Sequence, residues 1–349
     1  MAKYTKSIKI GNRTIGGKEN ILIQSMVNKH YSDINGIISQ INELENAGCE
    51  IVRISVVNEE SAKSIGKIKE KIDIPLVADI HFDYRLALLS IEYGIDKLRI
   101  NPGNIGEEEN IKKVVESSKK HNIPIRIGVN GGSLEKHILD KYKFPNSEAM
   151  VESAMYHINL IEKYDYNNII VSLKSSNVSE MYNAYKIISK KIEYPLHLGV
   201  TEAGTAFGGT IKSAIGIGGL ILEGIGDTIR VSLTEDPIEE IKVAKEILKV
   251  TGIRKEGVEI ISCPTCGRTE IDLVKLAKEV EKECKEIKKY VKIAVMGCVV
   301  NGPGEAKDAD FGIAGGKNSA VIFKKGEIIK KVSEKDIIKE LKILIKEMV

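Results

Sequence analysis

The sequence predicts a (β/α)8 TIM barrel followed by a smaller α+β domain. From residue 21 onward, β-rich runs alternate with helical patterns at intervals of roughly 25 to 30 residues, which is typical of repeated βα units. Eight such runs occur, and the rhythm changes after Val250. Eight strands, each followed by a helix, suit a closed barrel better than an open doubly wound sheet. We therefore expect a barrel domain in residues 1–252 and a second domain in residues 253–349.

The predicted barrel strands are rich in β-branched residues. They cover residues 21–26, 51–56, 76–80, 98–101, 125–130, 169–174, 196–201 and 228–233. Amphipathic stretches such as residues 35–47, 149–164 and 238–250 lie between them and predict helices. The residues before Ile21 are expected to form a hairpin under the barrel.

The second domain follows a different order of elements. A strand leads into a CPTCG turn and a long helix, and a further strand leads into the loop GCVVNGPGE. Two more β-rich runs and a last helix over residues 333–348 complete the pattern. This order predicts a separate α+β domain.

Composition and charge exclude several classes of function. Apolar residues make up 42% and charged residues 29% of the chain, which is normal for a globular protein. The net charge of +3 comes from interleaved charges and is not the footprint of a nucleic-acid-binding protein. No apolar run reaches the roughly 20 residues of a membrane span, and the N-terminus lacks an apolar signal core. We expect a cytoplasmic protein, in which cysteines are ligands or catalysts rather than disulfides.

Polar residues occur where the core of a barrel is normally apolar. Residues two or four apart on a strand point to the same side, and the carboxyl ends of barrel strands build the active site. Polar pairs of this kind end most of the predicted strands, with Glu202 just beyond the seventh. They are Arg53 and Ser55, Asp79 and His81, Arg99 and Asn101, Arg126 and Asn130, Ser172 and Lys174, His197 and Thr201, and Arg230 and Ser232.

Five of these side chains are cationic, namely Arg53, Arg99, Arg126, Lys174 and Arg230. Pointing into one barrel mouth, they would repel one another unless a multiply charged anion neutralised them, and guanidinium groups suit phosphate oxygens. The pattern indicates a phosphorylated substrate, most naturally a diphosphate. The alternative is a set of inward ion pairs with Asp79 and Glu202, but two acids are few for five cations.

The cysteines of the second domain predict an iron-sulfur cluster. Cys263 and Cys266 lie in the CPTCG turn, and Cys298 follows the next strand. Thiolates bind zinc or the iron of iron-sulfur clusters, and either kind of site normally has four protein ligands. Glu305, in the glycine-rich loop after Cys298, is the nearest candidate for the fourth, in a 4Fe-4S cluster.

A zinc site with an incomplete ligand set is the alternative interpretation, because such C-x-x-C turns are common in zinc ribbons. This domain offers no second C-x-x-C and no histidine. Cys284 falls on the apolar face of the long helix and Cys49 just precedes a strand, so both are expected to pack in the core.

Several long motifs resemble one known family. They are QSM, GCEIVRISV, ADIHFDYR, LRINPGNIG, PIRIGVNGGSLEK, LHLGVTEAG, EGIGDTIRVSL, CPTCGR and GCVVNGPGEA. Together they span nearly the whole chain and look like the bacterial two-domain form of the 4-hydroxy-3-methylbut-2-enyl diphosphate synthase family. This resemblance implies a reductive ring opening of methylerythritol cyclodiphosphate in non-mevalonate isoprenoid biosynthesis.

The resemblance also implies roles for particular residues. A barrel would be fused to a cluster domain similar to that of sulfite and nitrite reductases, with Cys263, Cys266, Cys298 and Glu305 as cluster ligands. The substrate-binding cations of the family fall on the five named above. Its acidic and hydrogen-bonding groups fall on Asp79, His81, Asn130, Glu202 and Asn301. We expect Glu202 to donate the proton, with His81 as the second candidate.

The partners follow from the same reasoning. No glycine-rich dinucleotide fingerprint follows a strand, so electrons are expected from a reduced ferredoxin or flavodoxin. Cys263 lies only about thirty residues beyond the eighth strand, and the resemblance implies a homodimer in which the cluster domain of one subunit caps the barrel of its partner. One departure from the family pattern is QSMVNKHYSD, which replaces a threonine-rich stretch.

Two other function classes remain open at this point. A cluster-containing hydro-lyase would need no electrons, so activity without reductant would favour it. A zinc-stapled barrel that binds a phosphorylated ligand would hold zinc without iron or sulfide.

Overall fold

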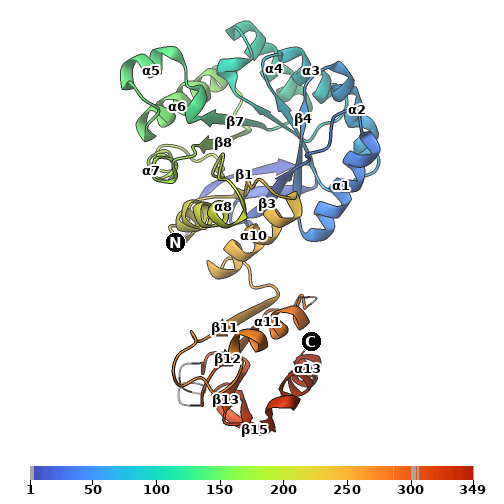
Figure 1. The fold of residues 1–349 in the computed structure, drawn as a ribbon. Coiled ribbons are helices and arrows are strands. Elements are labelled where there is room, and N and C mark those ends of the chain that lie inside the picture. The colour runs from blue at the N-terminus through green and yellow to red at the C-terminus, as the bar shows by residue number, and fades with distance from the viewer. Residues whose placement is uncertain (1–3, 286, 300–303, 305, 349) are drawn as a thin grey trace. The chain divides into compact units, whose positions relative to one another are not determined.

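The computed structural model describes residues 4–285, 287–299, 304 and 306–348. The chain divides into two compact units, Met1–Ile253 and Arg254–Val349, which are treated separately (Figure 1). Within the described residues, no helix is both long and apolar enough to cross a membrane.

The first unit contains eight parallel strands in the order β8-β7-β6-β5-β4-β3-β10-β9. A bridge between Val171 and Leu196 joins the two ends of this order and closes the barrel. The predicted barrel is therefore confirmed. Its strands are β3 (Leu22–Met26), β4 (Ile51–Val56), β5 (Leu76–Ile80), β6 (Lys97–Ile100), β7 (Ile125–Asn130), β8 (Ile169–Lys174), β9 (His197–Leu198) and β10 (Thr228–Ile229).

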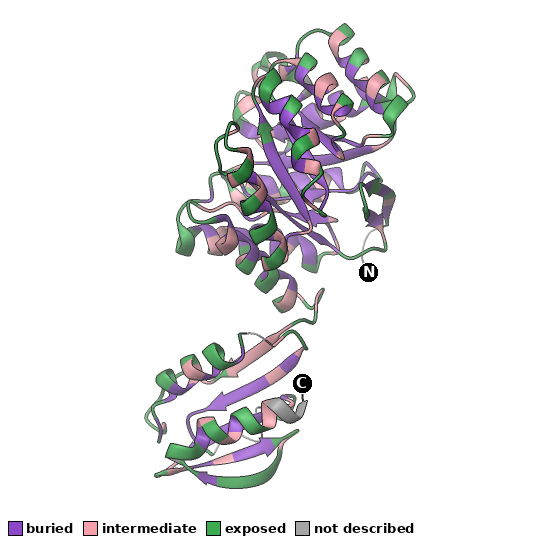
Figure 2. Ribbon diagram, turned by 90° about the vertical axis from the view of Figure 1, so that its right-hand side faces the viewer, coloured by how far each residue is buried: buried purple, intermediate pink, exposed green. Residues whose placement is uncertain are grey.

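Helices surround the strands, and their outer faces are exposed while the strands are buried (Figure 2). Polar caps start several of them, as in α2, where Asn58 and Ser61 form a capping box. The helices are α1 (Ile34–Ala47), α2 (Glu59–Lys69), α3 (Tyr84–Glu92), α4 (Glu108–His121), α5 (Lys136–Tyr142), α6 (Ser147–Glu162), α7 (Val178–Ile188), α8 (Ala206–Ser213), α9 (Gly219–Leu222) and α10 (Pro237–Val250).

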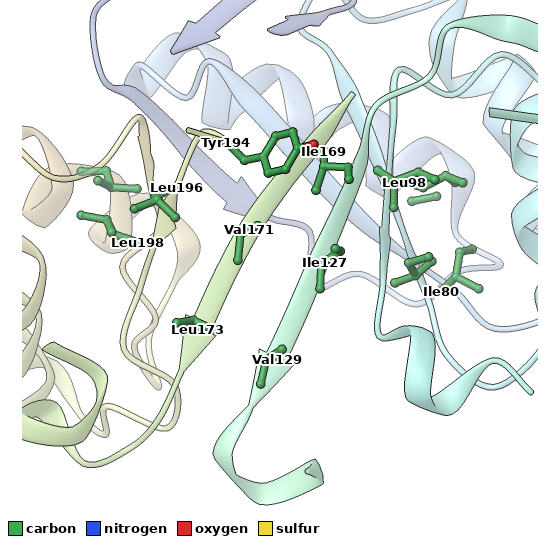
Figure 3. Close-up of a cluster of buried hydrophobic side chains, with 14 of the residues drawn as sticks. Ile80, Leu98, Ile127, Val129, Ile169, Val171, Leu173, Tyr194, Leu196 and Leu198 are labelled. Carbon is green, nitrogen blue, oxygen red and sulfur yellow. The ribbon is translucent and has the colours of Figure 1, made fainter. Parts of the chain in front are cut away.

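The alternation of side chains along each strand separates two environments. On β7 and β8, the outward residues Ile127, Val129, Val171 and Leu173 pack in the main apolar core between barrel and helices (Figure 3). The residues between them, including Arg126, face the interior of the barrel. One strand thus supplies an apolar face to the helices and a polar face to the lumen.

The expected hairpin before the barrel is present as β1 (Thr5–Ile10) and β2 (Arg13–Gly17). Its isoleucines form a separate apolar cluster with the first inward residue of several barrel strands. This cluster contains Ile8, Ile10, Ile15, Leu22, Ile51, Val77 and Ile170. The amino-terminal end of the lumen is therefore filled by apolar side chains, and polar groups remain only above it.

Strands β9 and β10 are shorter than the sequence predicts. Each has two residues, against the predicted 196–201 and 228–233. Beyond Leu198 the segments that follow β9 and β10 stay close together, since a Cβ on Gly199 would lie 2.8 Å from the carbonyl oxygen of Arg230. Isolated backbone bonds continue there, such as Arg230 N to Leu198 O at 2.9 Å, in place of a regular ladder.

The second unit is a five-stranded sheet in the order β11-β12-β13-β14-β15. The first three strands are parallel, and β14 and β15 form an antiparallel hairpin. Helices α11 and α13 share an apolar cluster with one face of the sheet. The elements are β11 (Val258–Ser262), α11 (Leu273–Glu283), β12 (Val291–Met296), β13 (Phe311–Gly316), β14 (Ser319–Lys324), β15 (Glu327–Ser333) and α13 (Ile337–Met348).

Candidate functional site

A polar cavity of about 180 Å³ opens at the carboxyl ends of the barrel strands. All eleven of its lining residues are among the polar residues predicted at the strand ends, and three of them are hydroxyl residues. The lining residues are Arg53, Asp79, His81, Arg99, Arg126, Asn130, Ser172, Lys174, Thr201, Arg230 and Ser232. All five predicted cations reach this one cavity, each from a different strand or from the residue just beyond it.

Asp79 is the hub of the ion pairs in this cavity. Its Oδ1 accepts a hydrogen bond from Arg99 Nη1 at 3.0 Å, and its Oδ2 lies 3.7 Å from Arg53 Nε. His81 Nε2 lies 3.6 Å from Oδ2 of Asp79 and 3.0 Å from Arg99 Nη1. Because a guanidinium can only donate, the bond from Arg99 assigns His81 Nε2 as an acceptor.

Charge fixes the ionisation of this hub. Burial favours the neutral form of the Asp79 carboxyl, but Arg53, His81 and Arg99 outweigh burial and hold its pKa well below the usual range. For Arg53, burial is the largest effect and lowers the pKa to about 9, although Asp79 opposes this shift. Asp79 is thus a permanent anion that orients two cations.

A second carboxylate supports Arg230 from outside the lumen. Glu240 of α10 is buried, and its Oε2 lies 3.9 Å from Arg230 Nε. The same carboxylate accepts hydrogen bonds from the Leu233 amide at 2.9 Å and from Ser25 Oγ at 3.4 Å. Burial raises the pKa of Glu240, against the attraction of Arg230. Sequence reasoning missed Glu240, because it lies on a helix rather than at a strand end.

Arg126 and Lys174 have no carboxylate partner within the described part of the chain. Arg126 Nη1 donates to Ser172 Oγ at 3.2 Å, while its Nε and Nη2 are buried without a hydrogen-bond partner. Burial and then neighbouring cations lower the pKa of both side chains well below their usual values. Buried donors without acceptors are costly, so this cavity is suited to an anion with several oxygens.

Glycines make room for two of these cations. A Cβ on Gly128 of β7 would lie 2.6 Å from Arg99 Nε, and one on Gly199 would lie 3.1 Å from Lys174 Nζ. Both glycines occupy inward positions where a side chain would compete with a cation. The small residues therefore determine where the charged groups can lie.

Several residues expected at the mouth lie elsewhere. Ser55 is exposed and lines a neighbouring cavity of about 410 Å³, and Asn101 caps the turn after β6 by accepting from the Gly103 amide. His197 is fully buried and its Nδ1 lies 2.8 Å from Thr228 Oγ1. For these three residues the expected convergence is corrected, because Ser55 lines another cavity, Asn101 bonds within its own turn and His197 is held by Thr228.

Of two further predicted site residues, the structure describes Glu202 but not Asn301. Glu202 is exposed, does not line the cavity, and has a left-handed backbone with φ of 52°, which is unusual for a residue other than glycine. It directly follows Thr201, which does line the cavity. Asn301 and Glu305 lie outside the described residues.

A polar layer beneath the cavity was not singled out from the sequence. Lys97 is fully buried two residues before Arg99, and its Nζ donates to Gln24 Oε1 at 3.1 Å, from β6 to β3. Burial, then Arg126 and Arg53, lower the pKa of Lys97 well below its usual value. The spacing of two from Arg99 is the signal that could have identified this residue.

The three predicted ligand cysteines lie after two neighbouring parallel strands of the second unit. Cys263 and Cys266 follow β11, and Cys298 follows β12, whose residue Val295 pairs with Ser262. All five cysteines of the chain are free. Among the described residues, no three histidine, cysteine or acidic side chains are gathered closely enough to hold a metal ion.

The surroundings of these thiols nevertheless fit thiolate ligands. The Gly297 amide donates to Cys263 Sγ at 3.2 Å. A hydrogen bond from the Arg268 backbone, with further contributions from Arg268 and Thr269, lowers the pKa of Cys266. Cys284 is buried in the apolar cluster of the sheet and helices, and burial raises its pKa to about 11, as a packing role requires.

Comparison with known proteins gives matches over both units. A family model described as the GcpE TIM-barrel domain matches residues 5–245, and one described as the GcpE protein C-terminal domain matches residues 259–347. A protein of Fusobacterium nucleatum subsp. nucleatum named 4-hydroxy-3-methylbut-2-en-1-yl diphosphate synthase (flavodoxin) is 64% identical over 99% of this chain and 98% of its own length. One of the same name from Caldanaerobacter subterraneus subsp. tengcongensis is 61% identical over 100% of this chain and 98% of its own length.

Solved structures with lower identity share the fold alone. A dihydropteroate synthase of Stenotrophomonas maltophilia covers 72% of this chain and 100% of its own, with a TM-score of 0.53 and 11% identity. An N-acetylneuraminic acid synthetase of Leptospira borgpetersenii covers 82% of this chain and 100% of its own, with a TM-score of 0.53 and 15% identity.

Proposed function

The chain belongs to the GcpE family, and from this membership we propose how its cavity and cysteines work together. It is an oxidoreductase of isoprenoid biosynthesis, a 4-hydroxy-3-methylbut-2-enyl diphosphate synthase. Its reaction opens 2-C-methyl-D-erythritol 2,4-cyclodiphosphate and removes a hydroxyl group. Two electrons from outside are consumed, and the oxygen leaves as water.

The observation that carries the substrate proposal is the excess of cations over acids in the barrel cavity. Five cationic side chains line it, against one carboxylate, Asp79. Among the described residues, two buried donor atoms of Arg126 have no partner and buried Lys174 has no carboxylate partner. A cyclic diphosphate supplies both the negative charge and the oxygens that these donors lack.

Asp79 and Glu240 act as positioning residues in this proposal. Asp79 holds Arg53 and Arg99, and Glu240 holds Arg230, so three guanidinium groups are oriented before the substrate arrives. Arg126 and Lys174 remain available for phosphate oxygens. Preorganised donors of this kind bind an anion without first giving up other partners.

Proton delivery falls to Glu202 in this proposal. His81 Nε2 lies 3.0 Å from Arg99 Nη1 and 3.6 Å from Asp79 Oδ2, so this nitrogen already belongs to the ion-pair network. Glu202 is exposed and directly follows Thr201, which lines the cavity, and the described residues give its carboxylate no hydrogen bond or ion pair. We assign His81 to substrate orientation and Glu202 to the proton that leaves with the hydroxyl oxygen.

Enzymes of this family use an iron-sulfur cluster, and we assign Cys263, Cys266, Cys298 and Glu305 as ligands of a 4Fe-4S cluster in this chain. When bound, the cluster supplies single-electron transfer and Lewis acidity. The Gly297 amide and the Arg268 backbone favour the thiolate forms that such ligands need. Asn301 is assigned to substrate contacts from the same loop.

The proposed partners complete the reaction. We propose reduced flavodoxin as the electron donor, with ferredoxin as the other candidate, and a homodimer in which each cluster unit caps the partner's barrel. The need for reduced thiols fits the cytoplasm.

The deciding experiment is an anaerobic assay of the reconstituted protein with the cyclodiphosphate. We expect 4-hydroxy-3-methylbut-2-enyl diphosphate only when a reductant is present, together with bound iron and sulfide and broad absorption near 400 nm, as is usual for such clusters. Product without reductant would indicate a hydro-lyase. Bound zinc without iron or sulfide would contradict the assignment.

A further inference from the structure

One segment of the second unit, residues 317–342, carries an excess of positive charge. Residues 317–342 contain eight lysines and four acidic residues, an excess of +4, while the whole chain has a net charge of only +3. All eight lysines are exposed. Lys330 pairs with Glu340 and Lys342 with Glu283, at 2.7 and 2.8 Å. For the other six, the described residues give no ion pair.

Three of the unpaired lysines lie toward the cysteine end of the sheet. The strands β11, β12 and β13 all run toward that end, so the turn after β13 and the end of β15 belong to it. Lys317 lies in the turn between β13 and β14, and Lys335 follows the end of β15. Lys331 is the third, within β15. We call Lys317, Lys331 and Lys335 the basic edge.

The sheet register connects this edge to the cysteine ligands. Lys331 pairs with Val321, Val321 with Ala314, and Ala314 with Met296. Met296 is the β12 neighbour of Cys263, since Val295 pairs with Ser262. One row of residues therefore runs across the sheet from Lys331 to Cys263, over four strand spacings or about 19 Å.

The turn that carries Lys317 is nearer still. A Cβ on Gly316 would lie 3.8 Å from Val299 Cγ1, and Val299 directly follows Cys298. Val299 is itself 48% exposed, and Ile329 of β15 is 50% exposed. The basic edge thus has apolar contacts beside it, as protein interfaces do.

A simpler explanation covers only part of this pattern. Lysines on an edge strand prevent pairing with other strands, which would account for Lys330 and Lys331. It does not account for Lys317 and Lys335, which lie outside the strands at the cysteine end. The three lysines of the basic edge outnumber the two acidic residues that flank Lys335 in the sequence, Glu334 and Asp336. An excess of positive charge favours fast association with a partner of opposite charge.

We propose that the basic edge is the docking surface for the electron donor, an acidic one-electron carrier protein. This inference rests on the proposed function, because only a chain that takes up external electrons needs such a surface. The surface lies on the unit that carries the three cysteines and beside the Cys298 loop. The donor would approach over Lys317 and Val299, with Lys331 and Lys335 attracting its acidic face.

The test compares two triple variants of the full chain. One is Lys317→Gln, Lys331→Gln and Lys335→Gln. The control is Lys275→Gln, Lys278→Gln and Lys282→Gln, which removes three exposed lysines from α11 of the same unit. Binding of flavodoxin is measured directly, and turnover is measured with reduced flavodoxin and separately with reduced methyl viologen.

We expect the basic-edge variant to weaken flavodoxin binding about tenfold at low ionic strength, with the difference shrinking as salt is added. Turnover with methyl viologen should be unchanged, and the α11 variant should behave as wild type in every assay. Equal weakening in both variants, or unchanged binding in the basic-edge variant, would overturn the proposal. A change in subunit number on light scattering would also overturn it, since the edge would then join copies of this chain.

Direct binding keeps this inference separate from the proposed function. If wild type binds flavodoxin through the basic edge but forms no product with either reductant, the proposed reaction fails and the surface stands. If methyl viologen supports turnover but the three substitutions leave flavodoxin binding unchanged, the proposed reaction is supported and the proposed docking surface is contradicted.

Discussion

Arg99 Nη1 donates to Asp79 Oδ1 at 3.0 Å, with both side chains buried at the carboxyl end of neighbouring strands. Asp79 is the one carboxylate among the described residues that line the cavity, and its other oxygen faces Arg53. A single anion therefore orients two guanidinium groups while the cavity as a whole stays cationic. The excess of cations should strengthen binding of an anionic substrate, but repulsion among the same cations should destabilise the unliganded fold.

Replacing Asp79 with asparagine should destabilise the protein in a pH-dependent way. The folded-state pKa of Asp79 lies below its unfolded value of about 3.9, so its stabilisation is present above that pH and is lost as pH falls below it. We expect Asp79→Asn to lower the free energy of unfolding by about 2 kcal/mol at pH 7. Urea unfolding of both proteins between about pH 2 and 7 checks this, and a difference that stays constant down to the lowest pH would contradict it.

Replacing Lys174 with methionine should have opposite effects on stability and binding. Lys174 is buried among cations, so removing its charge while keeping its length should stabilise the unliganded protein by about 1 kcal/mol. The same change should weaken substrate binding about a hundredfold, since a charge-assisted contact to phosphate is lost. Thermal unfolding with and without the cyclodiphosphate measures both, and a loss of stability in the unliganded variant would argue against this account.

Gly128→Ala should impair the site through Arg99. The added methyl would meet Arg99 Nε at 2.6 Å, so the guanidinium must move away from its position beside Asp79. We expect KM for the substrate to rise about tenfold while the barrel stays folded, as judged by circular dichroism. Gly132→Ala is the matched control, because nothing lies within 4 Å of its Cβ position and its φ is not positive. Equal effects of the two substitutions would show that Arg99 is not the cause.

The periodicity of the sequence was sufficient to predict the barrel. In strands such as Ile125–Asn130, apolar and polar or small residues alternate, so the two faces can be assigned from the sequence. Periodicity did not predict the end of β9, which stops before Gly199, where the backbone lies close to that of Arg230. The predicted strand was therefore too long. The cations were predictable from spacing along single strands. Glu240 and the bond from Lys97 to Gln24 were not, because they join elements far apart in the sequence. The placement of Ser55 beside another cavity and of His197 against Thr228 depended on contacts with neighbouring elements, which spacing along one strand does not encode.

Serine substitution should separate ligand cysteines from packing cysteines. Cys263→Ser, Cys266→Ser and Cys298→Ser should each lose most of the iron and sulfide after anaerobic reconstitution, because a hydroxyl is a poor ligand for iron-sulfur iron. Cys284→Ser should retain both, although burial of a hydroxyl in the apolar cluster should lower its thermal stability. Metal analysis and absorption near 400 nm are the measurements. Loss of iron in Cys284→Ser alone would contradict the ligand assignment.

Mixed dimers test whether subunits share an active site. Helix α10 ends at Val250 and β11 begins at Val258, so residues 251–257 join the units. In a βα barrel this helix runs back toward the amino ends of the strands, and the joining segment therefore starts at the end away from the cavity. The proposed sharing of one site between two subunits can be tested with one defect in each unit.

Arg126→Ala disables the barrel cavity and Cys298→Ser disables the cluster unit, so each homodimer should be inactive. In a hybrid dimer with shared sites, the intact barrel of one chain meets the intact cluster unit of the other, and one of the two sites works. Random mixing of equal amounts should then restore about a quarter of wild-type activity, since half of the dimers are hybrids. If each site is formed within one chain, no activity should be recovered. Absence of activity in a mixture in which native mass spectrometry detects hybrid dimers would therefore exclude sharing.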